Sequence, residues 1–188
     1  MLGAEGAYLL LALIGSIAPI VYNWQIAALK PCSYFEGPRG GVNVNIIWGT
    51  VLIIFTLIVC WLGQVTVVIA PRQATRLRLI ESEADVDPTF FADVRGEAAW
   101  DALSLWTLPV AGILLLLESP LWAYFGLIGG GMYLYFAGRG IAQRLIMQRR
   151  GIRVGKSEQL KLFYAALVLW GVIAVVTIVM AVMSLPLP

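Results

Sequence analysis

The chain of 188 residues contains no histidine and has few charged residues. Histidine is the usual near-neutral proton carrier and the commonest metal ligand. Its absence disfavours a His-ligated haem, chlorophyll or metal, and it removes the common partner of a nucleophilic serine or cysteine. Charged residues make up only 13% of the chain and apolar residues 60%, whereas a soluble domain has about 25% charged residues. We therefore expect an all-α integral membrane protein.

Cysteine is also scarce, with Cys32 and Cys60 as the two examples. Two cysteines are too few for a disulfide framework or for a zinc site with four ligands. Cys60 lies within an apolar run, and we expect it to behave as a small buried hydrophobic residue. Cys32 follows a proline in a polar connection, where a free thiol and an intermolecular link are both open.

Long apolar runs are what the sequence has in abundance. A spanning helix needs about 20 mostly apolar residues to cross a hydrocarbon layer of about 30 Å. The third and fourth such runs are separated only by Glu118, Ser119 and Pro120, which predicts a tight hairpin, with a re-entrant hairpin as the alternative. Pro109 predicts a kink. We expect a single membrane domain, residues 1–188, with five transmembrane helices at about 7–28, 46–70, 99–117, 121–137 and 160–184.

Lysine and arginine are distributed unevenly between the connections. Eleven of the thirteen lie within 71–98 and 138–161. Because positively charged loops stay in the cytoplasm, we expect 71–98 and 138–159 to be cytoplasmic segments. The N-terminus is then cytoplasmic and the C-terminus extracytoplasmic, in a multi-pass protein of the cell (inner) membrane.

The two cytoplasmic segments differ in charge. Segment 71–98 begins basic and becomes acidic, and we expect a solvated elbow in which Glu81 and Glu83 are exposed. Asp87 and Pro88 predict the start of a short amphipathic helix on lipid or against a partner. Segment 138–159 predicts a basic amphipathic extension that contacts lipid or a partner, or pairs with the acidic half of the first segment. Its predicted contact residues are Arg139, Arg144, Arg149, Arg150 and Arg153.

The middle of each predicted span has no charged or amide side chain. Ionisable groups within lipid are costly and usually serve a function, so this composition argues against conduction. Asp101 and Glu118 border the third span, and we expect an interfacial cap and a hairpin residue, respectively. Small residues let helices approach closely. We predict helix packing through Gly126, Gly129, Gly130 and Gly131.

These patterns favour a non-catalytic accessory or assembly subunit that packs on other membrane subunits or on itself and docks lipid through its basic segments. No catalytic spacing, metal site, cofactor site or nucleic-acid partner is expected. The alternative is a small homo-oligomeric transporter or channel in which Gln64, Thr66, Asp101 and the glycine triplet 129–131 line a path between subunits. An enzyme that acts on lipid headgroups through Asp101 and the arginine cluster is a third, weaker hypothesis.

Overall fold

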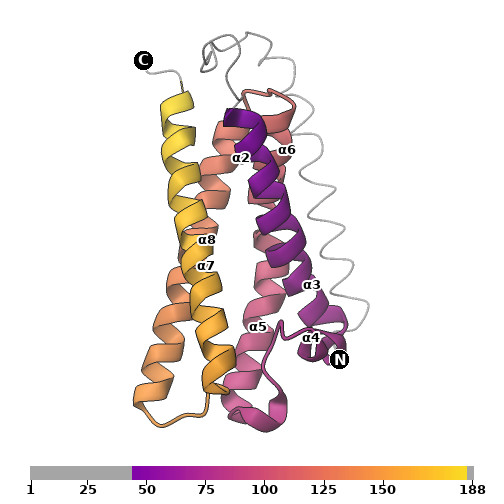
Figure 1. Cartoon of the computed structure of the whole chain (residues 1–188), viewed down its shortest axis with the longest axis vertical. Helices are drawn as coiled ribbons and strands as arrows, with labels where there is room; N and C mark the ends of the chain where they lie inside the picture. The colour runs from indigo at the N-terminus through magenta and orange to yellow at the C-terminus, as the bar shows by residue number, and fades with distance from the viewer. Residues whose placement is uncertain (1–43, 186–188) are drawn as a thin grey trace. The chain divides into compact units, whose positions relative to one another are not determined.

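The computed structural model describes residues 44–185, all of which belong to one compact unit, Glu36–Pro188. These residues form a bundle of long helices joined by short connections (Figure 1). The predicted span at about 7–28 and Cys32 lie outside the described residues.

The first described apolar run is one continuous helical stretch. It consists of α2 (Val44–Leu52), the π-helix η1 (Ile53–Trp61) and α3 (Leu62–Ile69), close to the predicted 46–70. The stretch ends at Ala70, whose backbone leaves the helical region, and the short helix α4 (Pro71–Arg76) begins at the following proline. Proline is tolerated there because the first helical amide has no partner within its helix.

The second stretch contains the predicted kink. Helix α5 (Pro88–Ser104) and helix α6 (Thr107–Leu116) are interrupted at Leu105 and Trp106. Pro109 has no N–H to donate to the carbonyl of Leu105, four residues earlier, so the break lies where the missing bond would be. At its start, α5 is capped by Asp87, whose Oδ1 accepts a 2.9 Å hydrogen bond from the Thr89 amide. The 3₁₀ turn η2 (Glu83–Asp85) precedes it.

Two helices of equal length complete the bundle. Helix α7 (Trp122–Arg149) follows α6 after a tight turn that contains Glu118 with φ +53°, as the predicted hairpin requires. It continues through the predicted basic extension and rises about 42 Å along its axis. Helix α8 (Ser157–Ser184) then returns along it (Figure 1).

Three of these helical stretches are long and apolar enough to cross a membrane: Val44–Ile69, Pro88–Leu116 and Ser157–Ser184. Between 22% and 44% of their most apolar windows is buried within the chain, so most of their surface faces outward. Helix α7 is as long as α8, but its glycines, tyrosines and terminal arginines lower its hydropathy. The described chain is therefore helical, and three of its helical stretches have the length and hydropathy of membrane-spanning helices.

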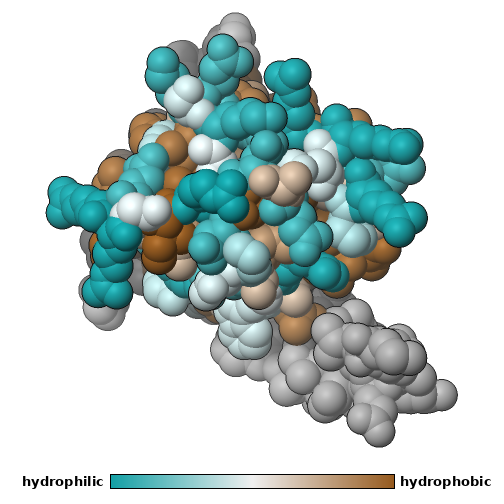
Figure 2. Space-filling model, turned by 90° about the horizontal axis from the view of Figure 1, so that it is seen from below, coloured by the Kyte–Doolittle hydropathy of each residue, from teal (hydrophilic) through white to brown (hydrophobic). Residues whose placement is uncertain are grey.

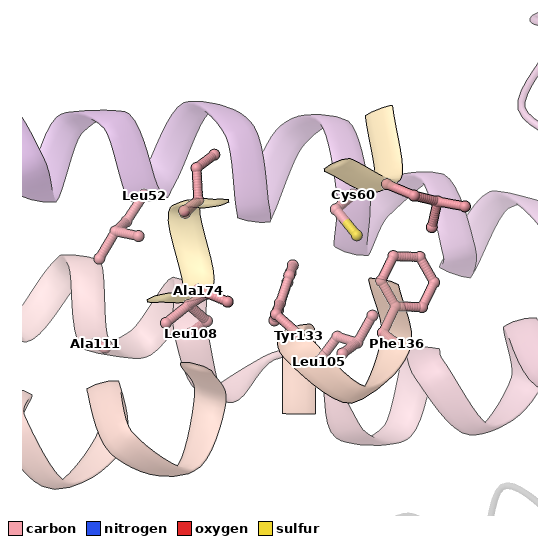
Figure 3. Packing of buried hydrophobic residues seen from close by; sticks show 10 residues of the cluster. Leu52, Cys60, Leu105, Leu108, Ala111, Tyr133, Phe136 and Ala174 are labelled. Atoms are coloured by element: carbon pink, nitrogen blue, oxygen red, sulfur yellow. The ribbon is translucent and has the colours of Figure 1, made fainter. Parts of the chain in front are cut away.

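The core lies where α7 packs between α6 and α8, with the first stretch against α6. Cys60 is 2% exposed, which confirms its prediction as a buried apolar residue. Figure 3 shows side chains from all these helices converging in this region. The labelled members of the cluster are Leu52, Cys60, Leu105, Leu108, Ala111, Tyr133, Phe136 and Ala174.

The four glycines of α7 that were predicted to mediate helix packing lie on three different sides of the helix. A Cβ added at Gly129 would lie 2.6 Å from the backbone nitrogen of Leu108 on α6. Cβ atoms added at Gly126 and Gly130 would meet α8, the latter 2.6 Å from Ile178 Cγ1. At Gly131 nothing described lies within 4 Å. Three of the four glycines therefore permit close approach within this chain, and Gly131 does not.

The π-helix is bonded to its neighbours through its backbone. The hydroxyl of Tyr133 on α7 donates a 3.0 Å hydrogen bond to the carbonyl of Thr56, and the indole N–H of Trp170 on α8 donates to the carbonyl of Phe55 at 3.2 Å. A π-helix places its carbonyls differently from an α-helix. These two bonds tie η1 to α7 and α8.

Candidate functional site

Opposite charges meet at one end of the bundle. The loop after α4, the start of α5 and the connection from α7 to α8 lie together there (Figure 1). We call this region, residues 77–97 and 139–161, the charged end. Figure 2 looks onto it and shows hydrophilic side chains around apolar ones. Four ion pairs connect its two segments, so the predicted pairing of basic arm and acidic loop is confirmed.

The outer pair of contacts joins α5 to α7. Asp93 and Glu97 lie one turn apart on α5 and share Arg139, with Nη2 of the arginine 3.6 Å from Asp93 Oδ2 and Nη1 in contact with Glu97. The amide of Gln143 also donates to Asp93. Spacing of four residues places two side chains on the same side of a helix, which explains why one arginine serves both carboxylates.

The inner pair is buried between aromatic rings. Arg144 and Glu81 are 6% and 1% exposed, and Nη2 of the arginine lies 3.4 Å from Oε1 of the glutamate. The guanidinium carbon lies 5.5 Å from the ring centroid of Phe90 on α5 and 5.2 Å from that of Phe163 on α8. Both distances are typical of cation–π contacts. We call these four residues the arginine clamp.

Glu81 was expected to be an exposed carboxylate, and this expectation is wrong because the residue is buried. Burial raises its pKa above the ordinary value, and the neighbouring Arg144 opposes that shift without cancelling it. Its second oxygen, Oε2, has no hydrogen-bond partner among the described residues. Ionising a carboxyl group in this buried position therefore costs free energy, and the neighbouring charge of Arg144 reduces that cost.

The expected solvated elbow is also wrong, because the loop folds onto the other segment. Val86 and Val154 form an antiparallel bridge, and the Asp87 amide donates a 2.8 Å hydrogen bond to the carbonyl of Arg153. Lys156 pairs with Asp85 at 2.9 Å. Phe90 is fully buried, so this face of its helix packs within the chain. The two segments form a single folded cap.

A second cluster lies along α5, beyond Glu97. Asp101 is 6% exposed, and its Oδ2 has no hydrogen-bond partner in the described part of the chain. It lies in the last turn of α5, which ends at Ser104, and it is buried, so it is not the cap at the start of a span that the sequence predicted. Asp101 lines two adjoining surface grooves of about 420 and 590 Å³. Trp100 and Tyr135 line both grooves as well.

Within one chain, the residues of the predicted transport path, which would lie between subunits, do not all line the same groove. Gly131 of α7 lines the smaller groove together with Asp101. Gln64 and Thr66 lie on α3, whereas the lining of these two grooves comes from α5, α7 and Leu105 in the break after α5. Thr66 donates its hydroxyl to the carbonyl of Leu62 within its own helix, at 2.7 Å. Asp101 and Gly131 therefore line one groove of this chain, and Gln64 and Thr66 do not line it.

The five predicted contact arginines fall into two groups. Arg139 and Arg144 are paired within the chain. Arg149, Arg150 and Arg153 are exposed at the end of α7 and in the following connection. The second group is the one available for lipid headgroups.

One member of the arginine clamp, Phe163, could not be identified from the sequence. Phe163 lies in an apolar run with no feature that sets it apart, whereas the opposite charges of the two segments were a usable signal for Glu81.

Across residues 44–185, no three Asp, Glu or Cys side chains converge as metal ligands. Comparisons with protein-family models, curated proteins and solved structures give no match.

Proposed function

We propose that this protein is a non-catalytic accessory or assembly subunit of a membrane complex. Its described interior is filled by apolar side chains from every long helix, and its charged end is closed by ion pairs within the chain. A bundle of this kind is suited to presenting outer helix faces to other subunits. The lipid bilayer and those subunits are its expected partners.

The proposal includes five spans with a cytoplasmic N-terminus. Residues 7–28 would supply the first span and α7 the fourth, because α7 packs along α8 and has the same length. The uneven distribution of lysine and arginine supports a cytoplasmic charged end. The exposed Arg149, Arg150 and Arg153 would then lie at anionic headgroups, each contributing on the order of 1 kcal/mol.

The observation that carries the proposal is an open small-residue face on α7. Gly138 and Ala142 lie one turn apart and are both exposed. A Cβ added at Gly138 would meet nothing within 4 Å, unlike the inward-facing Gly129 and Gly130. Pairs of small residues at this spacing let a second helix approach closely, and this pair lies just beyond the predicted fourth span, on the cytoplasmic continuation of α7. We propose this face as the contact with a partner helix.

The test is purification in a mild detergent followed by mass spectrometry of all chains recovered. The wild type is expected to retain other membrane proteins in a fixed ratio, and the double variant Gly138→Leu, Ala142→Leu to lose them. Ala165→Leu, on the exposed part of α8, is the matched control. Retention of the same chains by the double variant would refute this contact face, and a lone homo-oligomer from the wild type would refute the accessory role.

The second candidate function is a small homo-oligomeric transporter or channel. It is favoured by one observation, a buried and unpartnered carboxyl oxygen of Asp101 beside a surface groove. A buried ionisable group in a membrane helix is a marker of ion or substrate paths. This candidate predicts liposome flux that Asp101→Asn abolishes.

A further inference from the structure

The grooves beside α5 have both a charge imbalance and an apolar wall. Asp93, Glu97 and Asp101 lie at intervals of four residues along α5, and all three line the larger groove with Arg139. Arg139 pairs with Asp93 and Glu97. In the described chain no ion pair involves Asp101. The groove thus contains three acidic side chains and one basic side chain.

Asp101 provides the independent sign of a ligand. The residue is 6% exposed, it lines both grooves, and its buried Oδ2 accepts no hydrogen bond from residues 44–185. An unpaired buried acceptor costs about 1–3 kcal/mol, and more when it is charged. A cationic donor in the groove would remove that cost.

The surroundings of Asp101 specify what kind of cation fits. Trp100 and Tyr135 are 66% and 67% exposed and line both grooves, and aromatic faces attract ammonium groups. The smaller groove continues along Leu105, Leu127 and Ile128, which would suit a hydrocarbon chain. We propose that the grooves bind an amphiphile with an ammonium headgroup, the headgroup at Asp101 and the tail along Leu105 and α7. This site is independent of the proposed partner contact.

The experiment uses the full chain in detergent and a dodecylamine that carries bromine on its tail. Bromine quenches tryptophan fluorescence on contact, and the signal of interest is the part that Trp100→Phe removes. The wild type is expected to show saturable quenching, which unlabelled dodecylamine reverses and dodecanol does not. Asp101→Asn is expected to weaken binding about tenfold or more, the loss of one charge-assisted bond.

Gly131→Leu separates the site from any effect of Asp101 on folding. An added Cβ at this position meets nothing within 4 Å, so the new side chain would fill the groove without a clash and would leave the carboxylate in place. It is expected to weaken binding to a similar extent, while Ala165→Leu, which lines neither groove, binds like the wild type. Circular dichroism checks that each variant is folded.

Three results would overturn the site. They are equal competition by dodecanol, binding by Asp101→Asn or Gly131→Leu within about twofold of the wild type, and the absence of saturable quenching in the wild type. None of these results depends on whether other chains co-purify. Failure of the amphiphile site and failure of the accessory role are therefore distinguishable.

Discussion

Among single residues, Arg144 is the one whose removal we expect to cost the most stability. Arg144→Ala would leave Glu81 buried without its cation and would empty the space between Phe90 and Phe163. Breaking one side of a buried ion pair costs about 3–5 kcal/mol. We expect a loss of that size in the free energy of unfolding, measured by denaturant titration in detergent micelles.

Two further variants test the reason for that loss. Arg144→Lys keeps the charge and gives up the planar group that stacks on the two rings, so it should cost less than Arg144→Ala but remain measurable. Arg149→Ala, at an exposed position of the same helix, should change stability by no more than about 0.5 kcal/mol. Equal stability of Arg144→Ala and the wild type would show that the clamp is not a stabilising element.

The stability contributed by Glu81 should depend on pH. Burial raises its pKa in the folded chain above the ordinary value of 4.5, so the folded state holds this proton more tightly than the unfolded state. Its contribution is fully present below pH 4.5 and is lost as the pH rises through the folded-state value. The difference in melting temperature between wild type and Glu81→Gln should therefore shift against the wild type from pH 4.5 upward. A difference that is flat with pH would contradict the shift.

Helix α7 offers a matched comparison of two neighbouring glycines. Gly129→Ala would place a Cβ 2.6 Å from the Leu108 backbone, which cannot move aside as a flexible side chain can. We expect a loss of about 1–3 kcal/mol. Gly131→Ala meets nothing within 4 Å and should be neutral or stabilising by up to about 1 kcal/mol. Thermal unfolding of both variants checks this, and equal effects would disprove the assigned helix faces.

The π-helix η1 should depend on its two side-chain donors. Tyr133→Phe removes the hydrogen bond to the Thr56 carbonyl, and Trp170→Phe removes that to the Phe55 carbonyl. Each loss should cost about 1 kcal/mol or more, whereas Tyr124→Phe, at an exposed position of α7, should cost no more than about 0.5 kcal/mol. Denaturant titration separates these outcomes. A cost for Tyr124→Phe as large as for Tyr133→Phe would refute the role of the bond.

At the scale of elements, the sequence predicts helix positions better than helix faces. The run at 46–70, the break before Pro109 and the turn at Glu118 follow from apolar length and proline chemistry, and the structure has all three. Which side of a helix faces its neighbour is a different question. A spanning helix that is apolar all round has no polar stripe to orient it, so nothing in the sequence indicated that Gln64 and Thr66 do not line the grooves at Asp101 within one chain.

At the charged end, too, the sequence predicted one feature and not another. Complementary charge in the two segments was visible in the sequence, and the ion pairs between them are present. The burial of Glu81 was not visible, because it depends on Phe90 from α5 and Phe163 from α8 arriving at one place. Burial produced by several distant segments leaves no local pattern.

For the whole molecule, the proposed topology predicts opposite accessibility of the two connections that flank α7. In a background with Cys32→Ser, Glu118→Cys should react with a membrane-impermeant maleimide in intact cells, and Arg149→Cys only after permeabilisation. Both positions are exposed, and Cys60 is buried. The reverse pattern would contradict the orientation, and labelling of both from one side would show that α7 does not span.

The central claim is that the filled bundle serves packing and not conduction. The most direct measurement is ion and proton flux through liposomes that contain the purified chain alone, with empty liposomes as the reference. We predict no flux above that reference for wild type and Asp101→Asn alike. A flux present in the wild type and lost in Asp101→Asn would contradict the claim.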